Sequence, residues 1–151
     1  RAVFRRFPQV AAADGTNATP VNTEVYIGEV LVTHNCLITG VAVFNGSDVT
    51  DNLKVGLANS SGAVVATSIS TAGSGADAYQ LVPFVSSYQA IGPATYYILT
   101  IYAGNTSRYN AFAVGKFGAA KQTSQVFATG FTTITPPTTF TTNLANLAGL
   151  Y

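Results

Sequence analysis

Short apolar runs separated by turn signals fill residues 23–135, and this pattern allows few folds. Val, Ile, Tyr, Phe and Thr dominate the runs, as in β-strands, while Asn-Gly, Ser-Gly and Gly-Pro steps lie between them. No stretch of about ten residues or more has the apolar period of a helix. About eight strands without helices between them predict an all-β fold, an antiparallel β-sandwich of jelly-roll type. The nearest rival is an immunoglobulin-like sandwich, but its Cys…Trp…Cys core is absent.

Several runs also predict how their strands are placed. In "LKVGLA" Lys54 faces outward and the alternating apolar residues face the core, because successive side chains of a strand point to opposite faces. These inward residues are Leu53, Val55 and Leu57. The run "TYYILTIY" is apolar on both faces, which predicts a central strand. Gly28 suggests a bulge in "EVYIGEVLVT", and Pro83 places the end of "AYQLVPF" at a sheet edge or bulge. The stretch "TSQVFATGFTTIT" is expected to form one or two short strands.

The balance of residues limits the classes of function. Charged residues make up only 9% of the chain, against roughly 25% in ordinary soluble domains. The net charge of +1 gives no field that would attract nucleic acid. No apolar run approaches the ~20 residues that span a bilayer, and one cysteine excludes an intrachain disulfide. A weakly charged surface favours coverage by other subunits, and the alternative is a secreted domain with a neutral, Thr-rich exterior.

The chain divides into an extended arm (1–22), a sandwich domain (23–135) and a tail (136–151). The arm interleaves cations with aromatic rings, and its candidate docking residues are Arg1, Phe4, Arg5, Arg6 and Phe7. Such an arm can bind nucleic acid through phosphate contacts and stacking. Three cations support that weakly, so we favour docking into an acidic, apolar groove of a neighbouring protein, with a merely extended segment as the other alternative.

The tail contains no charged residue, since none occurs from Gln122 to Tyr151. Pro136-Pro137 predicts an extended exit from the domain, because proline locks φ and restricts the residue before it. The tail's candidate docking residues are Pro136, Pro137, Phe140, Leu144, Leu147, Leu150 and Tyr151. We therefore expect the tail to be an interface with another polypeptide, and its deletion to leave a folded domain that no longer assembles.

Candidate catalytic and metal-binding residues are few. His34 and Cys36 form a His-x-Cys pair without a second pair to complete a zinc site. Glu24 and Glu29 are separated by an odd number of positions, so a regular strand places them on opposite faces. No nucleophile elbow, P-loop or dinucleotide fingerprint is present. We expect no enzyme activity, no catalytic residue, no metal and no cofactor.

Two weaker binding hypotheses remain. Asn45, Asp48 and Asp51 in a turn can gather oxygens around Ca²⁺, although Asx-rich turns need no metal. Tyrosines near strand ends can stack on sugars, although most tyrosines at such positions cap the core. The candidates are Tyr88, Tyr102 and Tyr109.

Five stretches of the sequence can be compared with known proteins, namely "TPVNTEVYIGEVLVTHNCLITGVAVFNGS", "LKVGLANSSGAVVATS", "GADAYQLVPF", "IGPATYYILTIYAGNTSRYNAF" and "ITPPTTFTTNLANLAGLY". Together they resemble a family of tailed-bacteriophage virion structural proteins. The most specific marks are Asn45-Gly46, Gly92-Pro93 with Tyr96-Tyr97, and Pro136 through Phe140 with Tyr151. The resemblance covers roughly Thr19 to Tyr151, and "TTNLANLAG" departs from the Gly-Pro-Ile-like step expected in the linker.

The resemblance implies a non-enzymatic virion protein with a jelly-roll sandwich and brings no catalytic residues. Within that class we favour a capsid decoration, or cement, protein that binds and stabilises the major capsid protein shell through its arms. The expected partners are the major capsid protein or other virion subunits and further copies of the chain, and neither a membrane nor nucleic acid. The expected location is the capsid surface of the virion. The alternative is a receptor- or glycan-binding module associated with a tail or fibre.

Overall fold

The computed structural model describes residues 16–112, 118–140, 145–146 and 148–151. These residues form β-strands and no helix, and none of them belongs to a helix that could cross a membrane. The first strands are β1 (Thr16–Ala18), β2 (Val25–Val32), β3 (Cys36–Phe44), β4 (Leu53–Ala58), β5 (Val64–Thr67) and β6 (Tyr79–Ala90). The others are β7 (Ala94–Tyr102), β8 (Tyr109–Phe112), β9 (Ala119–Gln122), β10 (Ala145–Asn146) and β11 (Ala148–Leu150).

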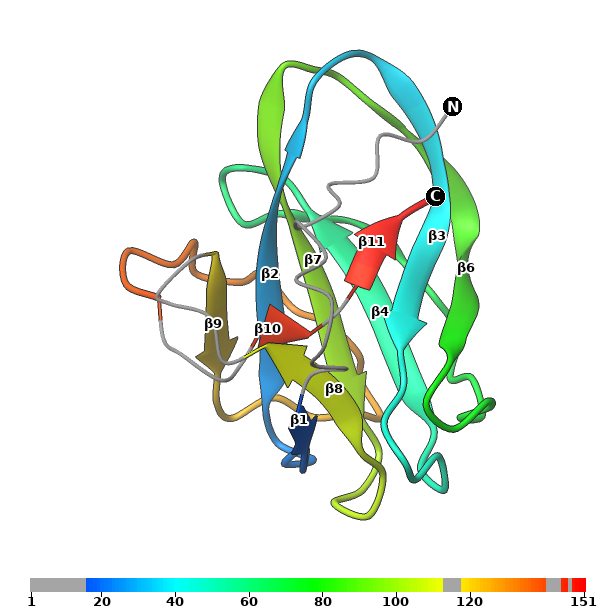
Figure 1. Ribbon diagram of the computed structural model, residues 1–151. Helices are drawn as coiled ribbons and strands as arrows, with labels where there is room; N and C mark the ends of the chain where they lie inside the picture. The colour runs from blue at the N-terminus through cyan, green and yellow to red at the C-terminus, as the bar shows by residue number, and fades with distance from the viewer. Residues whose placement is uncertain (1–15, 113–117, 141–144, 147) are drawn as a thin grey trace.

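One layer of the molecule is a five-stranded antiparallel sheet in the order β5-β4-β7-β2-β9 (Figure 1). Strand β7 lies at its centre, and consecutive side chains from Tyr96 to Ile101 are buried on alternating faces. Tyr96 and Ile98 face one apolar cluster, and Tyr97 and Leu99 face the other. The sequence-based prediction of a central strand is confirmed, because only a strand covered on both sides buries both sets of side chains.

The opposite layer consists of two three-stranded antiparallel sheets, β11-β3-β6 and β1-β8-β10. They meet where Asn45 bridges Tyr109, and the Gly46 N–H donates to the Arg108 carbonyl at 2.8 Å. The main core lies between the two layers, with buried residues from β2, β3, β4, β6, β7, β8 and β11. It includes the predicted inward residues Leu53, Val55 and Leu57. The molecule is therefore an antiparallel β-sandwich of jelly-roll-like form, as predicted.

An irregular segment, residues 123–140, covers the outer face of the five-stranded sheet. Ile134 is buried there against Val25, Leu99 and other residues of the sheet, and Phe127, Phe131 and Phe140 pack around it. The outward-facing Lys54 donates to the Phe127 carbonyl at 2.7 Å, and its ammonium group lies 4.9 Å from the centre of that ring. The predicted strands in "TSQVFATGFTTIT" do not form, since its backbone makes turns such as Gly130 N–H to Val126 carbonyl.

The two positional predictions within strands have different outcomes. Gly28 makes no bulge, because β2 and β7 stay in register from Tyr26 through Val32. A Cβ at this position would meet no atom within 4 Å, so the surrounding packing requires neither a glycine nor an irregular backbone here. Pro83 does lie in an edge strand, β6, and the β3–β6 register shifts between Ile38 and Gly40, beside the pairing of Gly40 with Pro83. The edge position suits proline because it has no N–H to donate.

Strands also occur within the ranges assigned to the arm and the tail. β1 pairs with β8, β10 pairs with the other side of β8, and β11 pairs with β3. β3 and β8 touch near Asn45 and Tyr109, and β10 and β11 lie between them in Figure 1. The C-terminal segment, described at residues 145–146 and 148–151, thus completes the second layer between β8 and β3. The boundaries of arm, domain and tail themselves stay a prediction.

Candidate interaction face

The predicted docking residues are distributed very differently in the structure. Arg1, Phe4, Arg5, Arg6, Phe7, Leu144 and Leu147 lie outside the described residues. Pro136 and Pro137 are half-buried at the end of the segment that covers the five-stranded sheet. Phe140 is also half-buried and packs against the cluster around Ile134. These three residues therefore contact their own domain.

Leu150 and Tyr151 are seated on β3 of the same chain. Leu150 lies opposite Val41 and belongs to the main core with 5% of its surface exposed. The Thr39 N–H donates to the Tyr151 carbonyl at 2.7 Å, and the Tyr151 N–H donates to the Gly40 carbonyl at 3.2 Å. In this conformation Leu150 cannot dock on a partner. The apolar character of the tail serves its own core at this position.

The strand β6 presents apolar side chains to solvent along one face. Val82 and Phe84 point into the core, whereas Tyr79, Leu81 and Val85 are 61%, 62% and 68% exposed. Tyr79, Leu81 and Pro83 occupy alternate positions of the strand and share a side. That side faces outward, because the residues that alternate with them, Val82 and Phe84, are the ones buried in the core.

The neighbouring strand β3 extends the same face. Ala42 lies opposite Leu81, and Phe44 lies opposite Tyr79, so each pair shares a side of the sheet. The rings of Phe44 and Tyr79 meet edge-on with centroids 4.8 Å apart. Leu37, which precedes the core residue Ile38, is 56% exposed. We call this surface the β3–β6 face, and it comprises Leu37, Ala42, Phe44, Tyr79, Leu81, Pro83, Val85 and Tyr151.

Tyr151 joins the face through β11. A side chain at Gly40 would collide with the Tyr151 ring, so the ring lies directly over this glycine. Burial raises the pKa of the Tyr151 phenol, which keeps it neutral. No charged residue occurs in β3, β6 or β11. The side chains of the face are therefore apolar or neutral. A signal for it exists in the sequence, namely a charge-free alternating run, but alternation does not say which side is covered.

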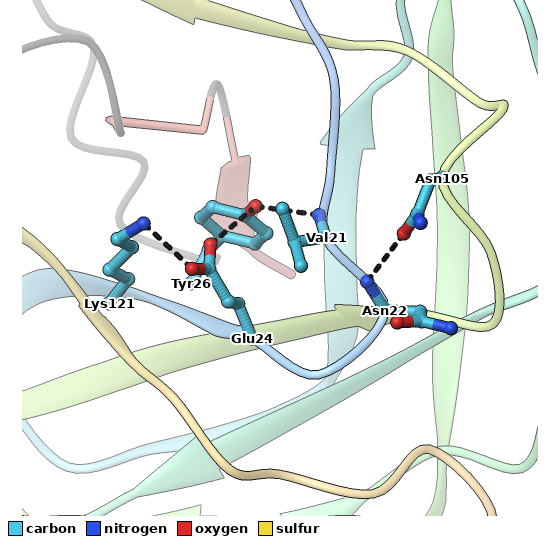
Figure 2. Close-up of polar contacts among 6 residues, drawn as sticks. All are labelled: Val21, Asn22, Glu24, Tyr26, Asn105 and Lys121. Carbon is cyan, nitrogen blue, oxygen red and sulfur yellow. Dashed lines mark hydrogen bonds and ion pairs between the residues drawn. The ribbon is translucent and has the colours of Figure 1, made fainter.

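A polar cluster anchors the chain at the start of β2, and Figure 2 shows its residues. Glu24, which is 8% exposed, pairs with Lys121 at 2.7 Å and accepts from the Tyr26 hydroxyl at 3.1 Å. The Val21 N–H donates to the Tyr26 oxygen at 3.0 Å. Burial raises the pKa of the Tyr26 phenol, so the hydroxyl remains a donor. Both carboxylate oxygens of Glu24 have partners, and the cluster acts as a tether between β2, β9 and the residues before β2.

The other candidate site residues have structural roles. Asp51 accepts from the backbone N–H groups of Thr106 and Ser107 at 2.8 and 2.7 Å, which fixes the β7–β8 loop. Asp48 accepts from the Thr50 N–H at 2.9 Å, and this hydrogen bond lowers the pKa of Asp48. Among the described residues, no three His, Cys, Asp or Glu side chains lie together as metal ligands would.

The histidine, the cysteine and the tyrosines proposed for sugar binding are also placed. His34 is exposed, and Cys36 packs half-buried against the core. Tyr102 and Tyr109 are buried in the core, in line with the alternative that such tyrosines cap the core, so in this conformation neither ring is open to a sugar. They belong to strands β7 and β8, whose sides toward the core are covered. Tyr88 is half-buried and meets Tyr96 edge-on.

The described residues thus converge on one kind of feature, an uncharged apolar face built on β3 and β6. Such a surface can be buried against another apolar surface. Comparison of the chain with protein-family models, with curated proteins and with solved structures gave no match.

Proposed function

We propose that this protein is a non-enzymatic structural subunit of a tailed-phage particle that binds neighbouring virion proteins through the β3–β6 face. The observation that carries the proposal is the exposure of Tyr79, Leu81 and Val85 on a face without charge. Contiguous exposed apolar surface on a soluble domain marks a binding site. The resemblance of "ITPPTTFTTNLANLAGLY" and the preceding stretches to phage virion proteins supports the class of partner.

Within the particle we favour the role of a capsid decoration protein. Complete burial of one such side chain stabilises a contact by ~1.5–3 kcal/mol, before the costs of ordering and association. A contact of this strength is weak when it is made once. Where one copy makes several such contacts, or where copies are linked to each other on the shell, the contacts are tied together and effective concentration supplies the remaining strength. The arm residues Arg1 to Phe7 can add contacts to the same partners.

The alternative of a glycan-binding module at a tail or fibre has less support. Sugar stacking requires exposed rings around one loop end, and Tyr102 and Tyr109 are buried. The exposed ring of Tyr79 lies against Phe44 within the sheet face. Its neighbours Leu81 and Val85 suit an apolar partner better than a sugar.

The test is a charge placed on the β3–β6 face. Leu81→Asp should reduce binding to particles that lack the protein by at least about tenfold, since a buried carboxylate without a partner is costly. Val126→Asp is the matched control, because Val126 is 56% exposed on the segment that covers the opposite sheet. Bound copies are counted by quantitative mass spectrometry, with the unfolding midpoint of each variant measured alongside.

Equal binding of both variants at wild-type level would refute the role of the face. Location is tested separately by counting copies relative to the major capsid protein in intact particles. A ratio fixed by the shell symmetry supports decoration. A few copies at one end of the particle support a tail component instead, and absence from particles overturns the proposed function.

A further inference from the structure

The C-terminal segment fills a slot between two strands that do not pair along their length. β8 and β3 meet at the bridge between Asn45 and Tyr109. Beyond that bridge, β8 pairs with β10, and β3 pairs with β11 (Figure 1). Each strand therefore offers its free edge to the segment, and a sheet edge is a template for an added strand.

The slot recognises the segment in three ways. Backbone pairing fixes its register, with Ala148 opposite Val43 and Leu150 opposite Val41. Leu150 inserts into the main core. The Thr39 hydroxyl and the Thr39 N–H both donate to the Tyr151 carbonyl, at 3.0 and 2.7 Å.

A glycine in β3 makes the last contact possible. A Cβ on Gly40 would overlap both the Tyr151 ring and the Val82 carbonyl, so Gly40 leaves the space that the tyrosine occupies. The slot is therefore shaped for this particular segment. A second copy of the chain carries an identical segment. That segment can therefore make the same contacts with the slot as the chain's own segment does.

The connection to the rest of the chain is short. Phe140 packs on the outer face of the five-stranded sheet, and four residues (141–144) separate it from Ala145, which pairs with β8 in the other layer. The contacts that the structure describes for the segment are made by residues 145–146 and 148–151. They are the same whether the segment comes from its own chain or from a neighbour, which is the condition for strand exchange.

We propose that the slot between β8 and β3 accepts the C-terminal segment of a second copy, and that copies are linked by exchange of this segment. Exchange creates no new type of contact, and it is favoured where copies are held at high local concentration. The inference concerns the association of the chain with itself, so it does not depend on the proposed virion partner.

Cysteine pairs across the exchanged strand test the proposal. Ala42 and Gly149 are direct partners, and paired Cα atoms across an antiparallel ladder lie ~4.5–5.5 Å apart, within the range of a disulfide. In a Cys36→Ala background, one chain carries Ala42→Cys and a second chain of different mass carries Gly149→Cys. The two are refolded together from urea and oxidised, and heterodimers are quantified by mass spectrometry.

Exchange predicts a heterodimer yield at least about tenfold above that of Ala42→Cys mixed with the exposed Ser60→Cys, which reports random thiol collision. A single chain carrying Ala42→Cys and Gly149→Cys must close its own disulfide, which verifies the register. If it closes while the mixed chains do not exceed the Ser60 control, exchange is wrong. If neither this pair nor Val43→Cys with Ala148→Cys closes, the slot itself is wrong and the proposal fails with it.

Discussion

At the scale of single residues, Tyr102 stands out because its hydroxyl is buried without a hydrogen-bond partner among the described residues. Its ring stacks on Tyr109 with centroids 5.9 Å apart, and Tyr109 in turn lies 5.0 Å from Tyr26. Burial raises the pKa of both Tyr102 and Tyr109 above the ordinary tyrosine range. The three rings form an aromatic column inside the sandwich whose hydroxyls must stay protonated.

Removing the Tyr102 hydroxyl should not weaken the fold. An unpaired buried hydroxyl costs ~1–3 kcal/mol, and Phe keeps the ring and its stacking. We expect Tyr102→Phe to raise the free energy of unfolding by about 1 kcal/mol in urea titrations. Tyr26→Phe is the contrasting variant and should lower stability, because that hydroxyl donates to Glu24 and accepts from Val21. A loss of stability in Tyr102→Phe would mean that the hydroxyl has a partner.

The same tyrosines predict alkaline instability. The unfolded chain loses phenol protons near the ordinary pKa of 10.0, while burial keeps Tyr26, Tyr102 and Tyr109 protonated in the folded chain. Their contribution to stability is therefore complete below pH 10 and is lost as pH rises above it. Each fully protected phenol adds a slope of about 1.4 kcal/mol per pH unit. Urea titrations of the wild type and Tyr102→Phe between about pH 8 and 12 should give a shallower decline for the variant.

At the scale of elements, the C-terminal segment is a part of the sandwich. β10 and β11 pair with β8 and β3, and Leu150 is a core residue. The structure therefore changes the expectation for tail deletion, since removal of residues 137–151 also removes Leu150 and Phe140 from their clusters. Loss of assembly in such a truncation would not separate docking from unfolding, and point variants are needed.

Leu150→Ala should destabilise the protein by ~2–4 kcal/mol, because it removes a buried leucine and leaves a cavity. Leu37→Ala is the matched control on β3, where the side chain is 56% exposed, and it should stay within about 0.5 kcal/mol of the wild type. Both are measured as free energies of unfolding in urea. Equal effects of the two substitutions would show that Leu150 is not seated in the core in solution.

At the scale of the whole molecule, the outer faces of the two layers differ in how far the chain itself covers them. The outer side of the five-stranded sheet is covered by residues 123–140 of the same chain, with Ile134 buried at its centre. The β3–β6 face has no such cover among the described residues, and Leu81 and Val85 are more than half exposed. This asymmetry is what makes one side of the molecule a candidate interface.

Binding through an uncharged face should depend little on salt. Raising the ionic strength from about 0.1 M to 1 M shortens the screening length from ~10 Å to ~3 Å, which weakens contacts between exposed charges and leaves apolar contacts in place. We expect the affinity for particles to change by less than about threefold, measured by co-sedimentation. A loss of tenfold or more would assign the binding to the arginines of the arm, Arg1, Arg5 and Arg6, instead of the face.

The fold class can be predicted from local pattern, because the alternation of inward and outward side chains along a strand is visible in neighbouring residues of the sequence. Leu53, Val55 and Leu57 could be assigned to the core in this way, and the two-sided run of β7 could be assigned to the centre of a sheet. The bulge at Gly28 was predicted wrongly because a glycine permits an irregularity and does not require one. Whether the ladder stays regular is settled by the strands on either side.

Leu81 and Leu150 show that alternation cannot predict which side chains are buried. Both are leucines in charge-free strands, yet one is 62% exposed and the other 5% exposed. Alternation divides a strand into two faces but does not say which face another layer will cover. That outcome depends on pairings between residues far apart in the chain, such as β11 with β3, and these contacts form only when the strands assemble. The strands and their spacing can therefore be predicted from the sequence. The exposure of the β3–β6 face and the position of the C-terminal segment are decided by packing between residues far apart in the chain.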